Sequence, residues 1–499
     1  MKKESPPSVV ELQGQENPLN WSSRKKWTCV MIVSWAGFLS PLASSIIAPA
    51  VGILVRDLGV TSHSVSVLPV SMYVLGLGFG PFVLSPTSEA VGRRWVYVFT
   101  GLVFVLFNLG SALCDSIASL SVLRLLSGIM GSTGPCLGAA SIADMFSPAE
   151  RGRAVSVYAV GPILGPSLGN MLGAWIAERT SSWQWPLRVV TIASASVPLL
   201  CYLLPETYAP VLLQRKKADL LGSQASKVPL SKTLKDIQIA CKRPFKLMFT
   251  NPVCTIFALY QAYMYGILYL AFTTFPLIFT RLSAVPGLKN YGWSIGISGL
   301  AYIPLALGSV TATLLNYFFA NRSYLWLVRR NQSRREASGL EDKERMQQPE
   351  KEGGGGAKPP VTRPKGKPEY RLPFSCLAIL ILAVGLFWFG WSSESGNLWV
   401  VPMFGIYLIG VGATLTFQCL QIYLVDAFIP YSASAIAVSV LLRSILGAVF
   451  PLFGERLYRS CGYGWGNSIL GFATLAVLPI SLSMLQWGEK VRERFKFRG

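Results

Sequence analysis

The sequence is poor in the residues on which most enzymes and soluble proteins depend. Its 499 residues include one histidine, His63, and only 14% are charged, whereas a soluble globular chain carries about 25%. The nine cysteines form no C-x-x-C pair and lie mostly in apolar stretches, as inert buried thiols do. These shortages exclude histidine-based catalysis and a cysteine–histidine metal site. We expect no enzyme activity, no metal and no cofactor.

Long apolar stretches take the place of the missing residues. Hydrophobic residues make up 52% of the chain. A helix needs about 20 apolar residues to cross a bilayer, and stretches of that length recur throughout, which predicts an all-α polytopic membrane protein. Twelve spans are expected, at residues 27–49, 65–86, 95–113, 120–144, 154–177, 185–205, 252–279, 293–320, 372–391, 397–421, 431–454 and 465–487.

The net charge of +21 is distributed unevenly over this topology. Of the 45 Lys and Arg residues, 36 fall on one side of the membrane, six on the other and three inside spans. Cytoplasmic segments carry such an excess of positive charge, so the tails 1–26 and 488–499 and the long loops are placed in the cytoplasm. No basic–aromatic patch accompanies the charge, and nucleic acid is not an expected partner.

The spans divide into two halves of six, residues 27–205 and 252–487. A basic loop, residues 206–251, joins the halves, and a low-complexity loop, residues 321–371, interrupts the second half. The composition of this second loop predicts disorder. Two repeated halves around a midplane site are the layout of many secondary transporters. We expect a monomer in the lipid bilayer.

Span five contains the segment GPILGPSLGN, residues 161–170. Proline and glycine are costly inside a helix, but membrane helices tolerate them where small residues allow close packing. A kinked packing helix is one interpretation. The segment also resembles the antiporter motif in the fifth helix of major facilitator exporters, in which close packing seals the cavity against leak. Its motif residues are Gly161, Pro162, Gly165, Pro166 and Gly169. The family form ends Gly-Gly, whereas Asn170 follows Gly169 here.

Five further segments, in order along the chain, resemble the fungal branch of the twelve-span drug:proton antiporters of the major facilitator superfamily. They are NPLNWSSRKKW at 17–27, GFGPFVLSPTSEAVGRRW at 78–95, RLLSG at 124–128, LLPETYAPVLLQRKKADL at 203–220, and YLVDAFIPYSASA at 423–435 with Arg443 and PLF at 451–453. The resemblance covers nearly the whole chain. It implies a major facilitator fold and exchange of a small-molecule substrate for protons.

The resemblance also implies a gating loop between spans two and three. Its residues are Glu89, Gly92, Arg93 and Arg94. Such a loop latches the two halves in the closed states, and Asp144 is the expected partner of one of the arginines. Asp426 is expected to play the matching role in the second half. An ordinary solvated turn is the alternative.

Three arginines lie inside spans, where a charge is costly and marks a functional site. The resemblance links Arg124 to proton coupling, and a structural arginine bonded to backbone carbonyls is the alternative. Arg443 has the same status. Arg188 lies one turn below Trp183 and Trp185, so it either contacts substrate or extends to the outer surface.

Acidic residues occur only at span ends, so the interior carries arginines without a mid-membrane carboxylate. This balance favours an anionic or neutral substrate over a cation. The candidate polar residues of the cavity are Ser71, Gln261, Tyr265, Thr416 and Gln418. We therefore expect a proton-coupled exporter of an organic acid such as itaconate or citrate, in the plasma or vacuolar membrane. Efflux of hydrophobic drugs or toxic metabolites is the close alternative, and a sensor without transport is a further one.

Overall fold

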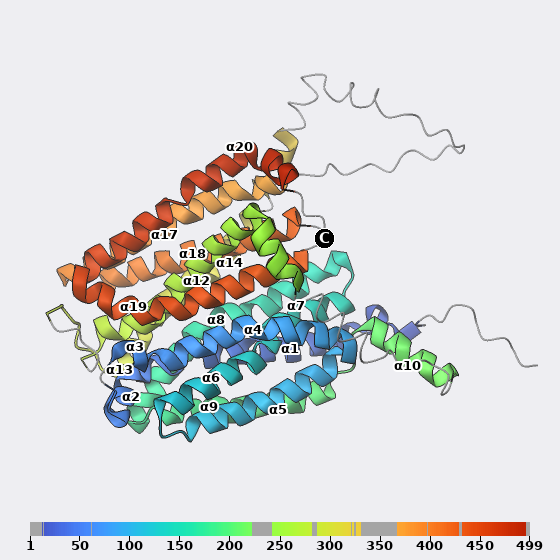
Figure 1. Ribbon diagram of the computed structural model, residues 1–499, viewed down its shortest axis with the longest axis horizontal. Coiled ribbons are helices and arrows are strands. Elements are labelled where there is room, and N and C mark those ends of the chain that lie inside the picture. The colour runs from blue at the N-terminus through green and yellow to red at the C-terminus, as the bar shows by residue number, and fades with distance from the viewer. Residues whose placement is uncertain are drawn as a thin grey trace, which may run out of the picture.

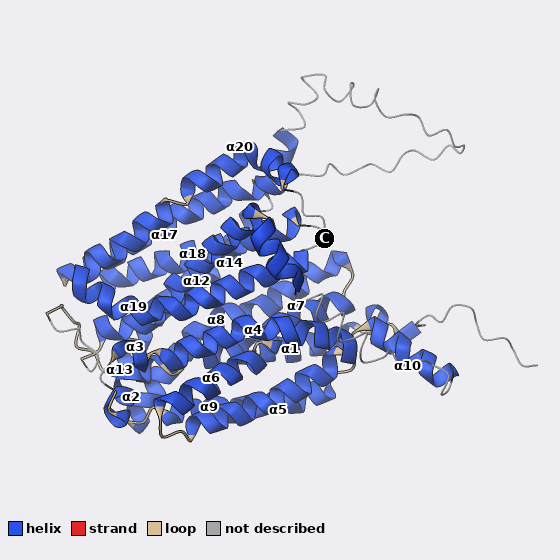
Figure 2. Cartoon of the chain, in the orientation of Figure 1, coloured by secondary structure: helices blue, strands red, loops and turns tan. Residues whose placement is uncertain are grey.

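The computed structural model of the chain describes residues 12, 14–60, 62–221, 242–281, 287–320, 322–323, 326–330, 367–396, 398–428 and 432–495. These residues are almost entirely helical (Figure 2). The β-type pairing among them is an isolated bridge between Thr280 and Trp293. The fold is therefore all-α, as the apolar stretches predict.

The helices form two groups that follow the two halves of the sequence. The first group contains α1 (Ser23–Ser45), α2 (Val51–Leu58), α3 (His63–Ser66), α4 (Leu68–Val91), α5 (Arg93–Ala112), α6 (Ile117–Gly131), α7 (Thr133–Met145), α8 (Pro148–Thr180) and α9 (Gln184–Leu203). The second contains α12 (Pro252–Phe279), α13 (Ile295–Ser298), α14 (Tyr302–Leu315), α17 (Leu372–Ser395), α18 (Val400–Ala427), α19 (Ser432–Leu475) and α20 (Leu478–Arg494). Between them lies α10 (Ala209–Leu221).

The groups lie side by side, with the blue-to-teal helices in the lower part of Figure 1 and the green-to-red ones in the upper part. They meet where α4 packs against α19 and α8 against α14. The short helices α2, α3 and α13 lie at one end of the bundle and α10 lies at the other (Figure 1). This arrangement agrees with the predicted sides, because α10 belongs to the basic central loop.

Ten helical segments in the described chain are long and apolar enough to cross a membrane. One of them, Ser434–Arg494, covers both of the last two predicted spans. Span five corresponds to α8, whose 33 residues extend about 50 Å at 1.5 Å per residue. All twelve predicted spans therefore lie on helices.

Some predicted boundaries are wrong. Span four is broken at Ser132 into α6 and α7. Most of the outer loop expected at residues 455–464 is helical, and the break between spans eleven and twelve lies within it at Gly462, where two helices join. The direction changes at Gly462, whose φ of 74° lies in the region that favours glycine.

Local sequence signals explain where several helices begin. The side chain of Asn251 accepts from the backbone N–H of Cys254 and caps α12, and Ser116 caps α6 in the same way. Both α12 and α8 also have proline in the first turn, where the missing N–H costs nothing. The eight cysteines that the structure describes are free thiols.

The glycines of span five form a seam with α1. Glycines at every fourth position of α8 face backbone carbonyl oxygens at every fourth position of α1. The facing pairs are Gly161 with Ser34, Gly165 with Phe38, Gly169 with Leu42, and Gly173 with Ile46. A Cβ on Gly165 would lie 2.9 Å from the carbonyl oxygen of Phe38, so the backbones approach too closely for a side chain. The motif therefore packs two helices of the same half together.

Candidate functional site: intramembrane arginines and charged clusters at the cytoplasmic ends

The predicted gating loop forms a buried ion pair in the N-terminal half. Nε of Arg93 lies 3.3 Å from Oδ2 of Asp144, and the same guanidinium donates to the hydroxyl of Ser88. Its plane also lies over the ring of Tyr208, 4.8 Å from the centroid. Arg93 is only 5% exposed, so this contact joins the ends of α4, α5 and α7 away from water.

A carboxylate that we did not predict completes this cluster. Glu206 is 5% exposed and accepts from the backbone N–H groups of Arg93 at 2.9 Å and Arg94 at 3.3 Å. These groups begin α5, where unpaired donors and the helix dipole favour a negative charge. Gly92 precedes them with a φ of 107°, and a Cβ there would meet the Glu206 carboxylate. Two requirements, conformation and space, therefore call for glycine at this position.

Glu89 lies outside this set of contacts. Its side chain is exposed, and it forms no ion pair with any residue that the structure describes. It is nevertheless near enough to influence Tyr208. Burial raises the pKa of the Tyr208 hydroxyl, the charge of Glu89 adds to this shift, and Arg93 opposes it. In this state of the protein, Glu206 rather than Glu89 is the acid at the start of α5.

The C-terminal half has a corresponding cluster at the start of α17. Arg371 pairs with Asp426 at 3.0 Å, just as the arginine at the start of α5 pairs with the aspartate at the end of α7. The nearby acid is Glu369, which is 2% exposed and lies 3.3 Å from Nε of Arg492 on α20. In the C-terminal half, the last helix supplies the arginine that faces the acid. In the N-terminal half, the acid itself, Glu206, follows the last helix of that half.

Arg124 is fully buried and pairs with backbone oxygens. It donates to the carbonyls of Ala43 at 2.7 Å, Ser44 at 3.0 Å and Pro69 at 3.3 Å. Its guanidinium lies 4.2 Å from the ring centroid of Tyr73. The first two carbonyls belong to the last turn of α1, where helix carbonyls lack intrahelical donors and a cation is favoured. Arg124 therefore caps α1 and ties it to α4 and α6.

Arg443 has a different environment. Its guanidinium lies 5.4 Å from the ring centroids of both Tyr265 on α12 and Phe417 on α18. Its Nε is buried without a hydrogen-bond partner among the described residues. The next residue, Ser444, lies against Gly78 of α4 in the opposite half. Arg443 is thus a cation at the boundary between the halves, and it forms no ion pair with a carboxylate among the residues that the structure describes.

Gln261 connects three helices one turn from this cation. Its amide donates to the carbonyl of Phe417 at 3.1 Å and to Gln421 at 2.8 Å, and it accepts from Ser439 on α19. Since every polar group of Gln261 is engaged, it holds the helices around Arg443 in place. Two of these polar partners, Gln421 and Ser439, were not among the residues predicted from the sequence.

The other predicted cavity residues do not all join this group. Gln418 faces α14, where its amide donates to Thr313 at 2.9 Å. Ser71 and Thr416 are buried, and their hydroxyls have no partner among the described residues. Arg188 lies 5.1 Å from the ring centroid of Trp185, which is itself exposed. This position agrees with the surface interpretation of Arg188.

The prolines of the span-five motif lie inside a continuous helix. Among the described hydrogen bonds, the carbonyl of Pro166 accepts from Ser45 on α1 at 2.7 Å and from Asn170 at 3.0 Å. Asn170, where the family form has glycine, is fully buried. Its side chain thus supplies a donor to the backbone of its own helix and does not disturb the glycine seam.

These features define a class of protein. Two six-helix halves meet along α4/α19 and α8/α14, charged clusters occupy matching helix ends, and cations lie within the membrane. This is the architecture of a secondary transporter rather than an enzyme.

Comparisons with known sequences identify the family. The sequence model described as Major Facilitator Superfamily matches residues 33–332. The chain is 34% identical to the "MFS-type transporter penM" of Penicillium rubens, over 100% of this chain and 92% of that one. It is 35% identical to the "MFS transporter cpaT" of Aspergillus oryzae, over 100% and 95%, and 34% identical to the "Efflux pump radE" of Floropilus chiversii, over 100% and 87%. The chain belongs to the major facilitator superfamily, as its motifs predict.

Solved structures support the same fold. The "Partially occluded inward open conformation of the xylose transporter XylE from E. coli" aligns with a TM-score of 0.61, at 13% identity, over 93% of this chain and 99% of that one. A second structure, the "proton:xylose symporter XylE bound to 6-bromo-6-deoxy-D-glucose", aligns with a TM-score of 0.60 at 16% identity, over 94% and 96%. The protein is an integral membrane transporter of small molecules.

Proposed function

We propose that this transporter exports a small organic anion from the cytoplasm by alternating access, in exchange for protons. The observation that carries the proposal is the state of Arg443. Its Nε is buried without a partner among the described residues, which is costly for a charged group. Arg443 lies on α19, which packs against α4 of the other half, where a substrate bound near the midplane would contact both. An anion bound there would supply the missing partner.

The chemistry of the site favours a carboxylate. A guanidinium binds a carboxylate through two parallel hydrogen bonds, and the rings of Tyr265 and Phe417 flank this guanidinium. No Asp or Glu occurs in the middle of any predicted span, so nothing at this depth would repel an anion. A single guanidinium matches a single carboxylate, so a compound with one such group and an apolar body, or a small diacid such as itaconate, fits better than citrate.

Export, proton exchange and location rest on other observations. One relative is described as an efflux pump, and the span-five glycine seam matches the motif of exporters. A structural neighbour is described as a proton symporter, and Arg124 is the residue proposed to link protons to the cycle. The positive charge of the central loop favours a cytoplasmic position for this loop and the tails. We propose the plasma membrane as its location and a monomer as the working unit.

The test is expression of the full chain in a fungal host that accumulates organic acids. The acids in the medium are measured by chromatography against a host with an empty vector, and growth is measured on lipophilic cationic drugs. The proposal predicts that one acid rises in the medium and that resistance to the cations does not change. Resistance to the cations without acid export would refute it.

Efflux of a hydrophobic metabolite or drug is the second candidate. It is favoured by the aromatic rings beside Arg443 and by the buried ring contact between Phe257 and Tyr423, 4.6 Å between centroids. Such a pump should still transport uncharged compounds when Arg443 is replaced. An anion exporter should lose transport of its anion in the same variant.

A further inference from the structure

The last turn of α1 has partners in both halves of the molecule. Its carbonyl oxygens at Ala43 and Ser44 accept from Arg124. The hydroxyl of Ser44 lies 2.8 Å from that of Tyr269 on α12. One helical turn thus connects the buried arginine of the N-terminal half with a helix of the C-terminal half.

The donors in this contact follow from the neighbouring hydrogen bonds. Ser44 donates its single hydroxyl hydrogen to the carbonyl of Pro41 at 2.6 Å, so Tyr269 is the donor to Ser44. Tyr265 donates in turn to Tyr269 at 3.4 Å, and the ring of Tyr265 lies beside Arg443. A directed chain of hydroxyl groups therefore extends from Tyr265, whose ring contacts Arg443, to the end of α1.

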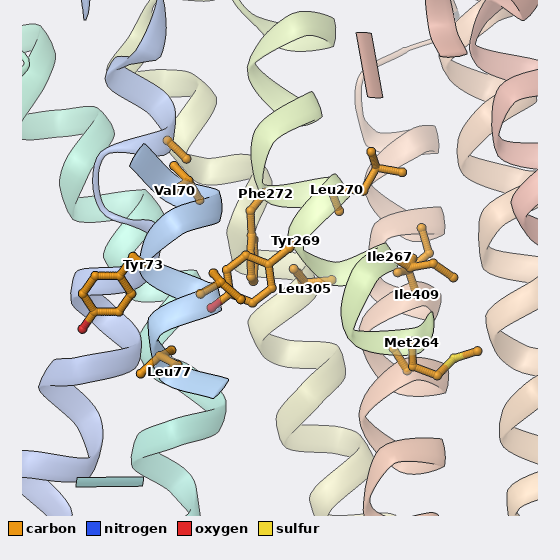
Figure 3. Close-up of a cluster of buried hydrophobic side chains, with 14 of the residues drawn as sticks. Val70, Tyr73, Leu77, Met264, Ile267, Tyr269, Leu270, Phe272, Leu305 and Ile409 are labelled. Atoms are coloured by element: carbon orange, nitrogen blue, oxygen red, sulfur yellow. The ribbon is translucent and has the colours of Figure 1, made fainter. Parts of the chain in front are cut away.

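This contact lies in the predicted outer part of the boundary between the halves. Ser44 and Tyr269 are both buried, and Figure 3 shows Tyr269 reaching from α12 toward α4, while Tyr73 of α4 points away from it. Nearer the outer end, Ser64 on α3 donates to the carbonyl of Leu452 on α19 at 2.8 Å. Opening of the outer side would separate α1 from α12, so the bond between Ser44 and Tyr269 would have to break.

We propose that Tyr269 is a latch residue whose hydrogen bond to Ser44 holds the outer side of the transporter closed. Arg124 controls the latch, because it fixes the turn of α1 that carries Ser44. The proposal rests on the alternating access of the proposed function, but it does not depend on an anion as the substrate.

A thiol at position 74 reports the state of the outer side. Val74 is fully buried on α4, and a Cβ on Gly447 of α19 would lie 3.1 Å from it, so it becomes accessible only when the halves separate. Val74→Cys is placed in the full chain with Cys461→Ser, which removes a half-buried thiol on the predicted outer side. Labelling by a membrane-impermeant maleimide is then followed in intact cells.

Tyr269→Phe removes the latch hydroxyl and keeps the ring. It is expected to raise the labelling rate about threefold to tenfold, the effect of losing one buried hydrogen bond on an equilibrium. Ser44→Ala should act in the same way, because the carbonyl that binds Arg124 remains. The matched control is Tyr302→Phe, since the buried Tyr302 donates to the carbonyl of Phe272 within the C-terminal half and should leave labelling unchanged.

The link to Arg124 is tested by a double-mutant cycle. Arg124→Lys should raise labelling, and its combination with Tyr269→Phe should add little, because both changes release the same turn. Effects that multiply would overturn the control by Arg124, and unchanged labelling in both Tyr269→Phe and Ser44→Ala would overturn the latch. Since labelling needs no substrate, a failure of the anion proposal would leave this result unaffected, and the reverse also holds.

Discussion

Arg124 in the N-terminal half and Arg443 in the C-terminal half carry the same charge inside predicted spans, yet their surroundings differ. The first is fully buried and donates to three backbone carbonyls, while its Nη1 has no partner among the described residues. The second lies between two aromatic rings, and its Nε has no partner among the described residues. A cation held by three carbonyls can tie helices together, whereas one flanked by aromatic rings has more capacity left for a ligand. On the proposed function, the comparison predicts a positioning and coupling role for Arg124 and substrate binding for Arg443.

The largest effect is expected at Arg443. Arg443→Lys keeps the charge but loses the planar fork, so the initial rate of acid export should fall about tenfold to a hundredfold, as for the loss of a charge-assisted hydrogen bond worth about 1.5–3 kcal/mol. Export is measured in cells with the amount of protein at the membrane normalised. Arg188→Gln is the control, because Arg188 lies over the exposed Trp185 and should leave the rate unchanged. A full rate in Arg443→Lys would remove the basis of the comparison.

At Arg124 we expect a smaller loss of export together with a loss of stability. Arg124→Gln leaves carbonyls at the end of α1 without donors, at about 1–3 kcal/mol for an unsatisfied buried group, so the melting temperature in detergent should fall. A coupling role also predicts that the dependence of export on external pH becomes flat. If stability falls and the pH dependence stays, Arg124 is structural only.

Loss of the arginine from either cytoplasmic cluster should slow transport, but by different amounts. Arg93 is more deeply buried than Arg371, with side-chain exposures of 6% and 20%. Arg93→Gln should therefore reduce turnover several-fold, and Arg371→Gln about half as much, with binding of substrate little changed. Initial rates over a range of internal substrate concentrations separate the two effects. Equal losses, or a change confined to the apparent affinity, would argue against matching latches.

The smallest effects on export are expected at Glu206 and Glu89, two glutamates near the loop between α4 and α5. Glu206→Gln removes the charge at the start of α5 and should slow export about twofold to fivefold, because a helix N-terminus stabilises a negative charge. Glu89→Gln should have no effect on a transporter in the state described here. A loss with Glu89→Gln alone would mean that Glu89 acts in a different state of the cycle.

The sequence determines the architecture more fully than the site. Apolar length places all twelve spans, since it is a physical requirement for crossing a bilayer, and the cost of a buried charge marks Arg124 and Arg443. Apolar length does not show how sharply two spans are joined, and the break between spans eleven and twelve is confined to a kink at Gly462. Bonding of Arg124 to backbone carbonyls was one of the two interpretations, but which helix supplies them could not be predicted, because such carbonyls are available at every helix end.

The position of Glu206 in the sequence carries a signal, although Glu206 is not among the predicted site residues. It follows span six directly and is buried against a helix from a distant part of the sequence. An acid among the basic residues of the central loop, immediately after a span, is unusual in a segment that favours positive charge. Gln421 and Ser439 gave no comparable signal, because their roles depend on the angle at which α18 and α19 meet α12.

The seam between α1 and α8 has a thermodynamic consequence for the N-terminal half. On the α8 side the seam consists of glycine Cα–H groups facing carbonyl oxygens, an arrangement of weak hydrogen bonds. Glycine has no rotamers to lose when the helices meet, so the α8 side of the contact adds no side-chain entropy cost. Heating or a change of lipid can therefore shift side-chain populations elsewhere, while the spacing of this pair stays fixed until the helices separate altogether.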